Sequence, residues 1–192
     1  MKTGKTVKVL LTAATAAGML AGCGSKTDTD TFRFASELDI QGMDSTVVDD
    51  GMSFNAIHAI TDGLTAVNEK GKTAPALAKS WDVSEDGKTY TFHLRDAKWS
   101  NGDKVTANDF VYSWRKIIKD AGNYAYMLGN GGASVKNADA LMELGANATD
   151  EQMATLGVTA KDDKTLVVEL ENKVPYFTDL MAFPCYFPQN QK

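Results

Sequence analysis

The residues best suited to covalent or metal chemistry are few in this 192-residue chain. It has two histidines, His58 and His93, and two cysteines, Cys23 and Cys185. Neither a His-Glu-x-x-His motif nor a paired-cysteine motif accompanies them, so no zinc site is predicted. The sequence also lacks a Gly-x-Ser-x-Gly elbow and a phosphate-binding loop ending in Lys and Ser or Thr. We therefore predict no enzyme, no catalytic residue, no metal and no cofactor, and expect both histidines to be packing or surface residues.

Cys23 is the cysteine with a recognisable chemical context. Three lysines at positions 2 to 8 precede a mostly apolar stretch over 9–20, which ends in Leu-Ala-Gly-Cys at 20–23. This order resembles the bacterial lipobox, in which small residues admit a peptidase and the cysteine sulfur carries a diacylglyceryl group. The apolar stretch is too short to span a bilayer, which needs about 20 residues. We predict a lipoprotein signal peptide over 1–22, and a lipidated Cys23 with a flexible tether over 23–30.

Two acyl chains would anchor the chain stably, because each buried CH₂ contributes about 0.8 kcal/mol. With Cys23 lipidated, Cys185 has no partner for an intrachain disulfide. We expect Cys185, which lies in Phe-Pro-Cys-Tyr-Phe at 183–187, to be a small buried hydrophobe.

The elements expected in the body mix strands and helices. A helix capped by Ser53 should end near Gly63, and strands over 80–83 and 89–94 should form a hairpin around the turn at 84–88. A capping box at 106–109 should start an amphipathic helix. A helix over 135–144, paired strands over 158–160 and 166–170, and a short helix over 175–181 should follow. Hairpins without strict strand-helix-strand alternation favour a mixed-sheet α/β or α+β fold.

The charge balance excludes one class of partner. The chain has 20 Lys and Arg against 25 Asp and Glu, and three of the lysines lie in the first eight residues. The body is therefore more acidic than the net charge of −5 indicates. Because proteins that follow a phosphate backbone need clustered basic residues, we predict no nucleic-acid binding.

Four stretches carry a resemblance to one family. They are PALAKSW at 75–81, SEDGKTYTFHLR at 84–95, KWSNG at 98–102 and VTANDFVYSW at 105–114. They closely resemble the signature of the oligopeptide-binding proteins, the extracellular solute-binding proteins of family 5 that serve as substrate receptors of peptide ABC importers. The resemblance extends over essentially the whole body of the chain.

The resemblance implies a fold and a site. It implies the first lobe of a two-lobed, periplasmic-binding-protein-like (type II) clamp, spanning 31–192, incomplete and with the second lobe absent. A sheet of this lobe would keep an unpaired edge. By resemblance, the residues near the ligand are those of the loop before the first helix, Asp49, Asp50, Gly51 and Met52, together with Tyr124. Trp81, Trp99 and Trp114 belong to the family signature, and we interpret them as packing residues.

The implied function is capture of oligopeptides for an ABC importer. The partners would be the peptide, the permease subunits and, through the palmitate-type lipid anchor, the extracytoplasmic face of a Gram-positive cell membrane. Three alternatives stay open. The chain could be a truncated surface lipoprotein without transport activity. It could be a receptor for a dipeptide, a nickel complex or haem. An enzyme would require His58 or His93 to lie close to an Asp.

Overall fold

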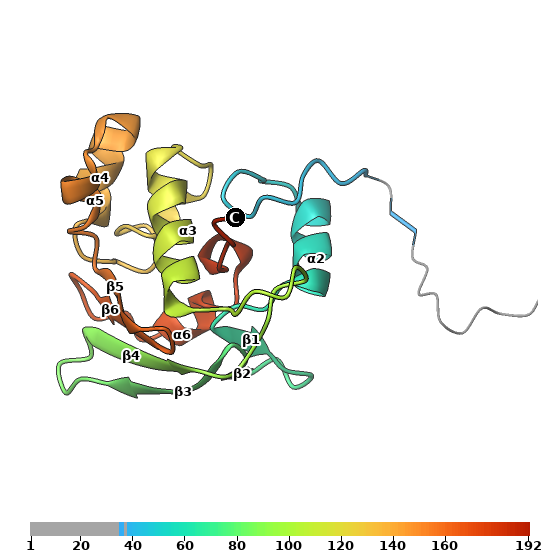
Figure 1. Ribbon diagram of the computed structural model, residues 1–192, viewed down its shortest axis with the longest axis horizontal. Coiled ribbons are helices and arrows are strands. Elements are labelled where there is room, and N and C mark those ends of the chain that lie inside the picture. The colour runs from blue at the N-terminus through green and yellow to red at the C-terminus, as the bar shows by residue number, and fades with distance from the viewer. Residues whose placement is uncertain (1–34, 37) are drawn as a thin grey trace, which may run out of the picture. The chain divides into compact units, whose positions relative to one another are not determined.

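The computed structural model describes residues 35–36 and 38–192 (Figure 1). The predicted signal peptide, Cys23 and the tether lie outside the described residues. The chain divides into two compact units, Met1–Glu37 and Leu38–Lys192, and the second contains all the helices and strands given below. Among the described residues, no helix is both long and apolar enough to cross a membrane.

Helices and strands are mixed along the second unit, as expected. In chain order they are α2 (Gly51–Ile60), β1 (Thr65–Val67), β2 (Thr73–Pro75), β3 (Ala78–Val83), β4 (Thr89–Leu94), α3 (Ala107–Lys119), α4 (Ala138–Leu144), α5 (Asp150–Met153), β5 (Val158–Asp162), β6 (Thr165–Glu169) and α6 (Phe177–Leu180). β1 and β2 form one ribbon, and a second sheet has the order β3-β4-β6-β5. The described strands pair only in antiparallel fashion, so the sheets are not mixed, although the α+β content is confirmed.

The predicted hairpin is confirmed as β3 and β4. Its turn is closed by Asp86, which accepts hydrogen bonds from Ser84 Oγ (2.5 Å) and from the Lys88 backbone N–H (3.0 Å). Gly87 adopts φ +70°, a conformation that glycine tolerates at low cost. Burial alternates along β4, with Tyr90, Phe92 and Leu94 on the buried face. One face of the larger sheet therefore supplies a wall of the core.

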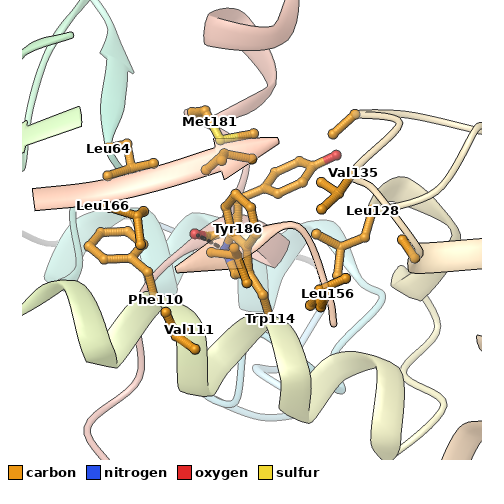
Figure 2. Packing of buried hydrophobic residues seen from close by; sticks show 14 of the residues in the cluster. Leu64, Phe110, Val111, Trp114, Leu128, Val135, Leu156, Leu166, Met181 and Tyr186 are labelled. Atoms are coloured by element: carbon orange, nitrogen blue, oxygen red, sulfur yellow. Dashed lines mark hydrogen bonds between the residues drawn. The ribbon is translucent and has the colours of Figure 1, made fainter. Parts of the chain in front are cut away.

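Helix α3 covers that core. Its capping box is present, and the Thr106 N–H donates to the Asp109 carboxylate at 2.8 Å. Phe110, Trp114 and Ile117 follow at helical spacing and are fully buried. Figure 2 shows Trp114 of α3 beneath Tyr186, with aliphatic side chains from the neighbouring elements around them. The amphipathic pattern thus fixes which side of α3 faces inward.

Three boundaries differ from the sequence prediction. The cap of α2 is Asp50 rather than Ser53, and Asp50 Oδ1 accepts from the Ser53 N–H at 2.8 Å. α4 begins at residue 138 rather than 135, because Val135 pairs with Leu170 in an isolated bridge and Asn137 takes a left-handed φ of 64°. α6 begins at residue 177, two positions after the expected start.

The segment after α6 runs through the core. Cys185, Tyr186 and Phe187 are buried, and two side chains of α3 bind its carbonyls. Ser113 Oγ donates to the Phe187 carbonyl at 2.7 Å, and Trp114 Nε1 donates to the Tyr186 carbonyl at 3.0 Å. Cys185 is therefore a buried hydrophobe, as expected, and burial raises the pKa of its thiol far above the ordinary value.

Candidate functional site

The acidic segment predicted from the resemblance lies at the N-terminus of α2. It was expected as a loop, but only Asp49 and Asp50 precede the helix, whereas Gly51 and Met52 form its first turn. Hydrogen bonds from Ser53 hold the pKa of Asp50 below its ordinary value, so the carboxylate is charged. Its second oxygen, Oδ2, is buried and has no hydrogen bond within the part of the chain that the structure describes.

Tyr124 lies just after α3, where it caps a short 3-10 turn over 125–127. Its ring contacts Phe54 of α2 edge-on at a centroid distance of 5.3 Å, and Phe183 at 5.3 Å. The ring of Tyr126 stacks on it at 6.0 Å with an interplanar angle of 27°. Tyr124 is half-buried, and the side chain of Tyr126 is 52% exposed. Tyr124 is thus a packing residue on one side and part of an aromatic surface on the other.

The structure brings these two predicted segments together. Asn123 Nδ2, next to Tyr124, donates to Asp49 Oδ2 at 2.9 Å, although the two residues are 74 positions apart in the sequence. Gly122 permits the approach, because a Cβ there would lie 2.1 Å from the Thr46 carbonyl oxygen. Neither Asn123 nor Gly122 was singled out from the sequence, where the only signal was the adjoining Tyr124.

Lys116 of α3 reinforces this junction from the helix. Its ammonium contacts Asp44 Oδ2 at 2.9 Å and Thr46 Oγ1 at 2.6 Å. Burial of Asp44 opposes ionisation, but hydrogen bonds from Lys116, Thr46 and Gln189 outweigh it and hold the pKa of Asp44 far below its ordinary value. The segment before α2 is therefore fixed to α3 by charge as well as by packing.

We name Asp49, Asp50, Met52, Tyr124 and Tyr126 the Tyr124 surface. It combines two carboxylates with two stacked phenol rings. Carboxylates accept hydrogen bonds from N–H groups, and tyrosine offers both an apolar ring and a hydroxyl. This combination can bind a polar, extended ligand, and it contains no nucleophile.

The two histidines lie elsewhere. His93 Nε2 is 2.8 Å from Asp82 Oδ2, with side-chain exposures of 37% and 81%, so the histidine-aspartate proximity required by the enzyme alternative does occur. Within the described residues, however, that histidine has no hydrogen bond to a serine, threonine or cysteine. His58 packs edge-on against Phe187 at 5.2 Å, and burial lowers its pKa. Across the described part of the chain, no three His, Cys, Asp or Glu residues are grouped as metal ligands would be.

Comparison with known proteins identifies the family. The model for bacterial extracellular solute-binding proteins, family 5 Middle, matches residues 72–192. A dipeptide-binding protein of Lactococcus lactis is 40% identical over 196 residues, which cover 100% of this chain and 34% of that protein. The oligopeptide-binding protein OppA of Bacillus subtilis is 42% identical over 149 residues, covering 76% of this chain and 26% of its own length.

Solved structures give the same result for the fold. The substrate-binding domain of an oligopeptide ABC transporter from Bacillus anthracis superposes with a TM-score of 0.75 at 40% identity, covering 82% of this chain and 29% of that one. Listeria monocytogenes OppA bound to peptide gives a TM-score of 0.69 at 38% identity, covering 78% and 28%. The chain thus spans about a third or less of the length of these relatives. The resemblance seen in the sequence and the expected fold class are both confirmed, and the chain belongs to family 5 of the bacterial extracellular solute-binding proteins.

Proposed function

We propose that this chain is part of an extracytoplasmic receptor that binds oligopeptides and passes them to the permease of an ABC importer, without chemical conversion. The relatives named above are described as peptide-binding proteins rather than as enzymes. The observation that carries the proposal to particular residues is the junction of α2 with Tyr124. Two segments that the family resemblance implicates, distant in sequence, form one surface through the Asn123–Asp49 hydrogen bond.

The chemistry of the Tyr124 surface suits a peptide main chain. Asp49 and Asp50 can accept hydrogen bonds from backbone N–H groups, and the rings of Tyr124 and Tyr126 can cover a side chain of any type. Binding directed at the main chain provides affinity without requiring one sequence, as in strand addition to a sheet edge. A receptor for varied peptides needs this property.

The test measures peptide affinity by isothermal titration calorimetry. Because the chain spans about a third of its relatives, it is inserted in place of the matching segment of the Lactococcus lactis protein, and both this chimera and the chain alone are titrated. Tyr124→Phe should preserve the ring packing, whereas Tyr124→Ala should weaken tetrapeptide binding about 2- to 10-fold, as expected for loss of an aromatic contact. Tyr112→Ala, on the outer face of α3, serves as the control.

The acidic arm of the surface is tested in parallel. Asp49→Asn should weaken binding, while Asp163→Asn, at an exposed carboxylate, should not. Unchanged tetrapeptide affinity in both Tyr124→Ala and Asp49→Asn would show that the Tyr124 surface is not the ligand site. Because the Lactococcus lactis dipeptide-binding relative aligns over the whole chain, dipeptides are a second candidate ligand. A dipeptide that binds the chimera more tightly than tetrapeptides would favour that alternative.

We further propose the domain arrangement predicted from the sequence, with a signal peptide over 1–22, lipidated Cys23 and tether over 23–30, and the binding lobe from residue 31. It is supported by the order of basic, apolar and small residues before the cysteine. Metabolic labelling with radioactive palmitate should mark the wild-type chain in the membrane fraction of a Gram-positive host. Cys23→Ala should lose the label, and a labelled Cys23→Ala chain would disprove the anchor.

A further inference from the structure

The outer face of α3 borders the largest groove we find among the described residues, with a volume of about 680 Å³. Tyr112, Arg115 and Lys119 line it from α3, at the i, i+3 and i+7 positions opposite the buried stripe. Met153 of α5 and Gln191 of the C-terminal segment complete the walls, and Figure 1 shows α5 beside α3. Pockets of this size hold small organic ligands in other proteins.

The basic residues of the groove differ in one respect. Lys119 pairs with Asp150 at 3.1 Å, and Lys116 pairs with Asp44 at 2.9 Å and with Asp120 at 3.2 Å. Arg115 has no hydrogen bond or ion pair within the described residues, and its Nε atom is buried without an acceptor.

A buried donor without a partner is destabilising, and arginine cannot lose its proton to avoid this cost. In a chain with an excess of acidic residues, a guanidinium without a carboxylate is unexpected on stability grounds. Its planar fork of donors matches a carboxylate in two parallel hydrogen bonds. The groove therefore lacks one acceptor, and an anion would supply it.

The remaining lining selects among anions. Met153 is buried, Val111 is nearly so, and the ring of Tyr112 lies three positions from Arg115 on the same side of the helix. A fully polar anion would leave these apolar groups without contacts, whereas an acid with an apolar body would cover them. We propose that this groove binds a small organic acid, with its carboxylate on Arg115 and its apolar body against Tyr112 and Met153. This site is separate from the Tyr124 surface, since no residue of that surface lines the groove.

The experiment titrates the full 192-residue chain, labelled with ¹⁵N, by NMR. The probes are 3-phenylpropanoate, its neutral amide and acetate. The acid should bind with an affinity about tenfold higher than the amide, because only the acid provides a charged acceptor. Acetate, which lacks the apolar body, should bind more weakly than the acid. Equal affinity for the acid and the amide would overturn the proposal.

Substitutions assign the effect to Arg115. Arg115→Gln should reduce affinity for the acid about tenfold and make the acid and the amide equivalent. Arg115→Lys keeps the charge but loses the fork, so an intermediate affinity is expected, and it provides the reading if the Gln variant does not fold. Lys70→Gln removes the same charge from an exposed turn and is the matched control. Wild-type affinity for the acid in both Arg115 variants would refute the site, as would equal losses in Lys70→Gln.

Discussion

Replacing Trp114 with phenylalanine is expected to lower the free energy of unfolding by about 2–4 kcal/mol. Trp114 is fully buried, and its Nε1–H donates at 3.0 Å to the buried carbonyl of Tyr186 (Figure 2). Phenylalanine has no such donor, so the carbonyl would stay buried without this partner, which costs about 1–3 kcal/mol. The smaller ring also leaves a void of about 40 Å³, and at about 24 cal/mol per Å³ this adds about 1 kcal/mol.

Urea denaturation followed by circular dichroism measures this loss. The midpoint should fall without a change in the slope, because the surface exposed on unfolding is nearly the same. In a thermal scan the same loss corresponds to about 5–15 °C for a domain of this size. Trp81→Phe is the matched control, since Trp81 is half-buried and donates no hydrogen bond within the described residues; it should cost less than about 1 kcal/mol. A Trp114→Phe chain as stable as Trp81→Phe would refute the assignment of this hydrogen bond to the core.

Three further predictions concern charge, close packing and the thiol. Because the pKa of Asp44 is lowered in the folded state, its stabilisation is present above about pH 4 and is lost as the pH falls below that value; the stability advantage of wild type over Asp44→Asn, about 1 kcal/mol or less for this partly exposed group, should therefore shrink between about pH 5 and pH 2 in urea titrations. An advantage that grows on acidification would contradict it. Gly63→Ala should destabilise by about 1–3 kcal/mol in the same assay, because its Cβ would lie 2.4 Å from the Met181 carbonyl oxygen; wild-type stability would show that the backbones can separate freely. In a Cys23→Ser background, Ellman's reagent should leave Cys185 unmodified until the chain is denatured, and fast labelling of the native chain would show that this thiol is accessible.

Local features were predictable because their causes lie within a few residues. The turn at 84–88 depends on Asp86 and Gly87, and the start of α3 depends on Thr106 and Asp109, so each could be identified without tertiary contacts. The boundaries that were misplaced depend on distant partners. α4 begins late because Val135 is held in a bridge to Leu170, which no pattern near residue 135 indicates.

The candidate site follows the same division. The resemblance indicated Tyr124 and the acidic segment separately, each from nearby sequence. Their contact depends on Asn123 reaching Asp49 and on Gly122 passing close to Thr46, contacts between residues more than 70 positions apart. The sequence also predicted the cap of α2 incorrectly, because Asp50 and Ser53 are both good capping residues and the local pattern does not choose between them.

By itself, the sequence determined the family, the mixture of helices and strands, the buried face of α3 and the burial of Cys185, because these properties follow from short-range patterns and composition. Only the tertiary structure decided that α2 and Tyr124 share one surface. It alone decided that Arg115 has no partner while Lys116 and Lys119 each have one. The physical reason is that hydrogen bonds and ion pairs act over a few ångströms in space, so which side chains meet depends on how the whole chain is packed.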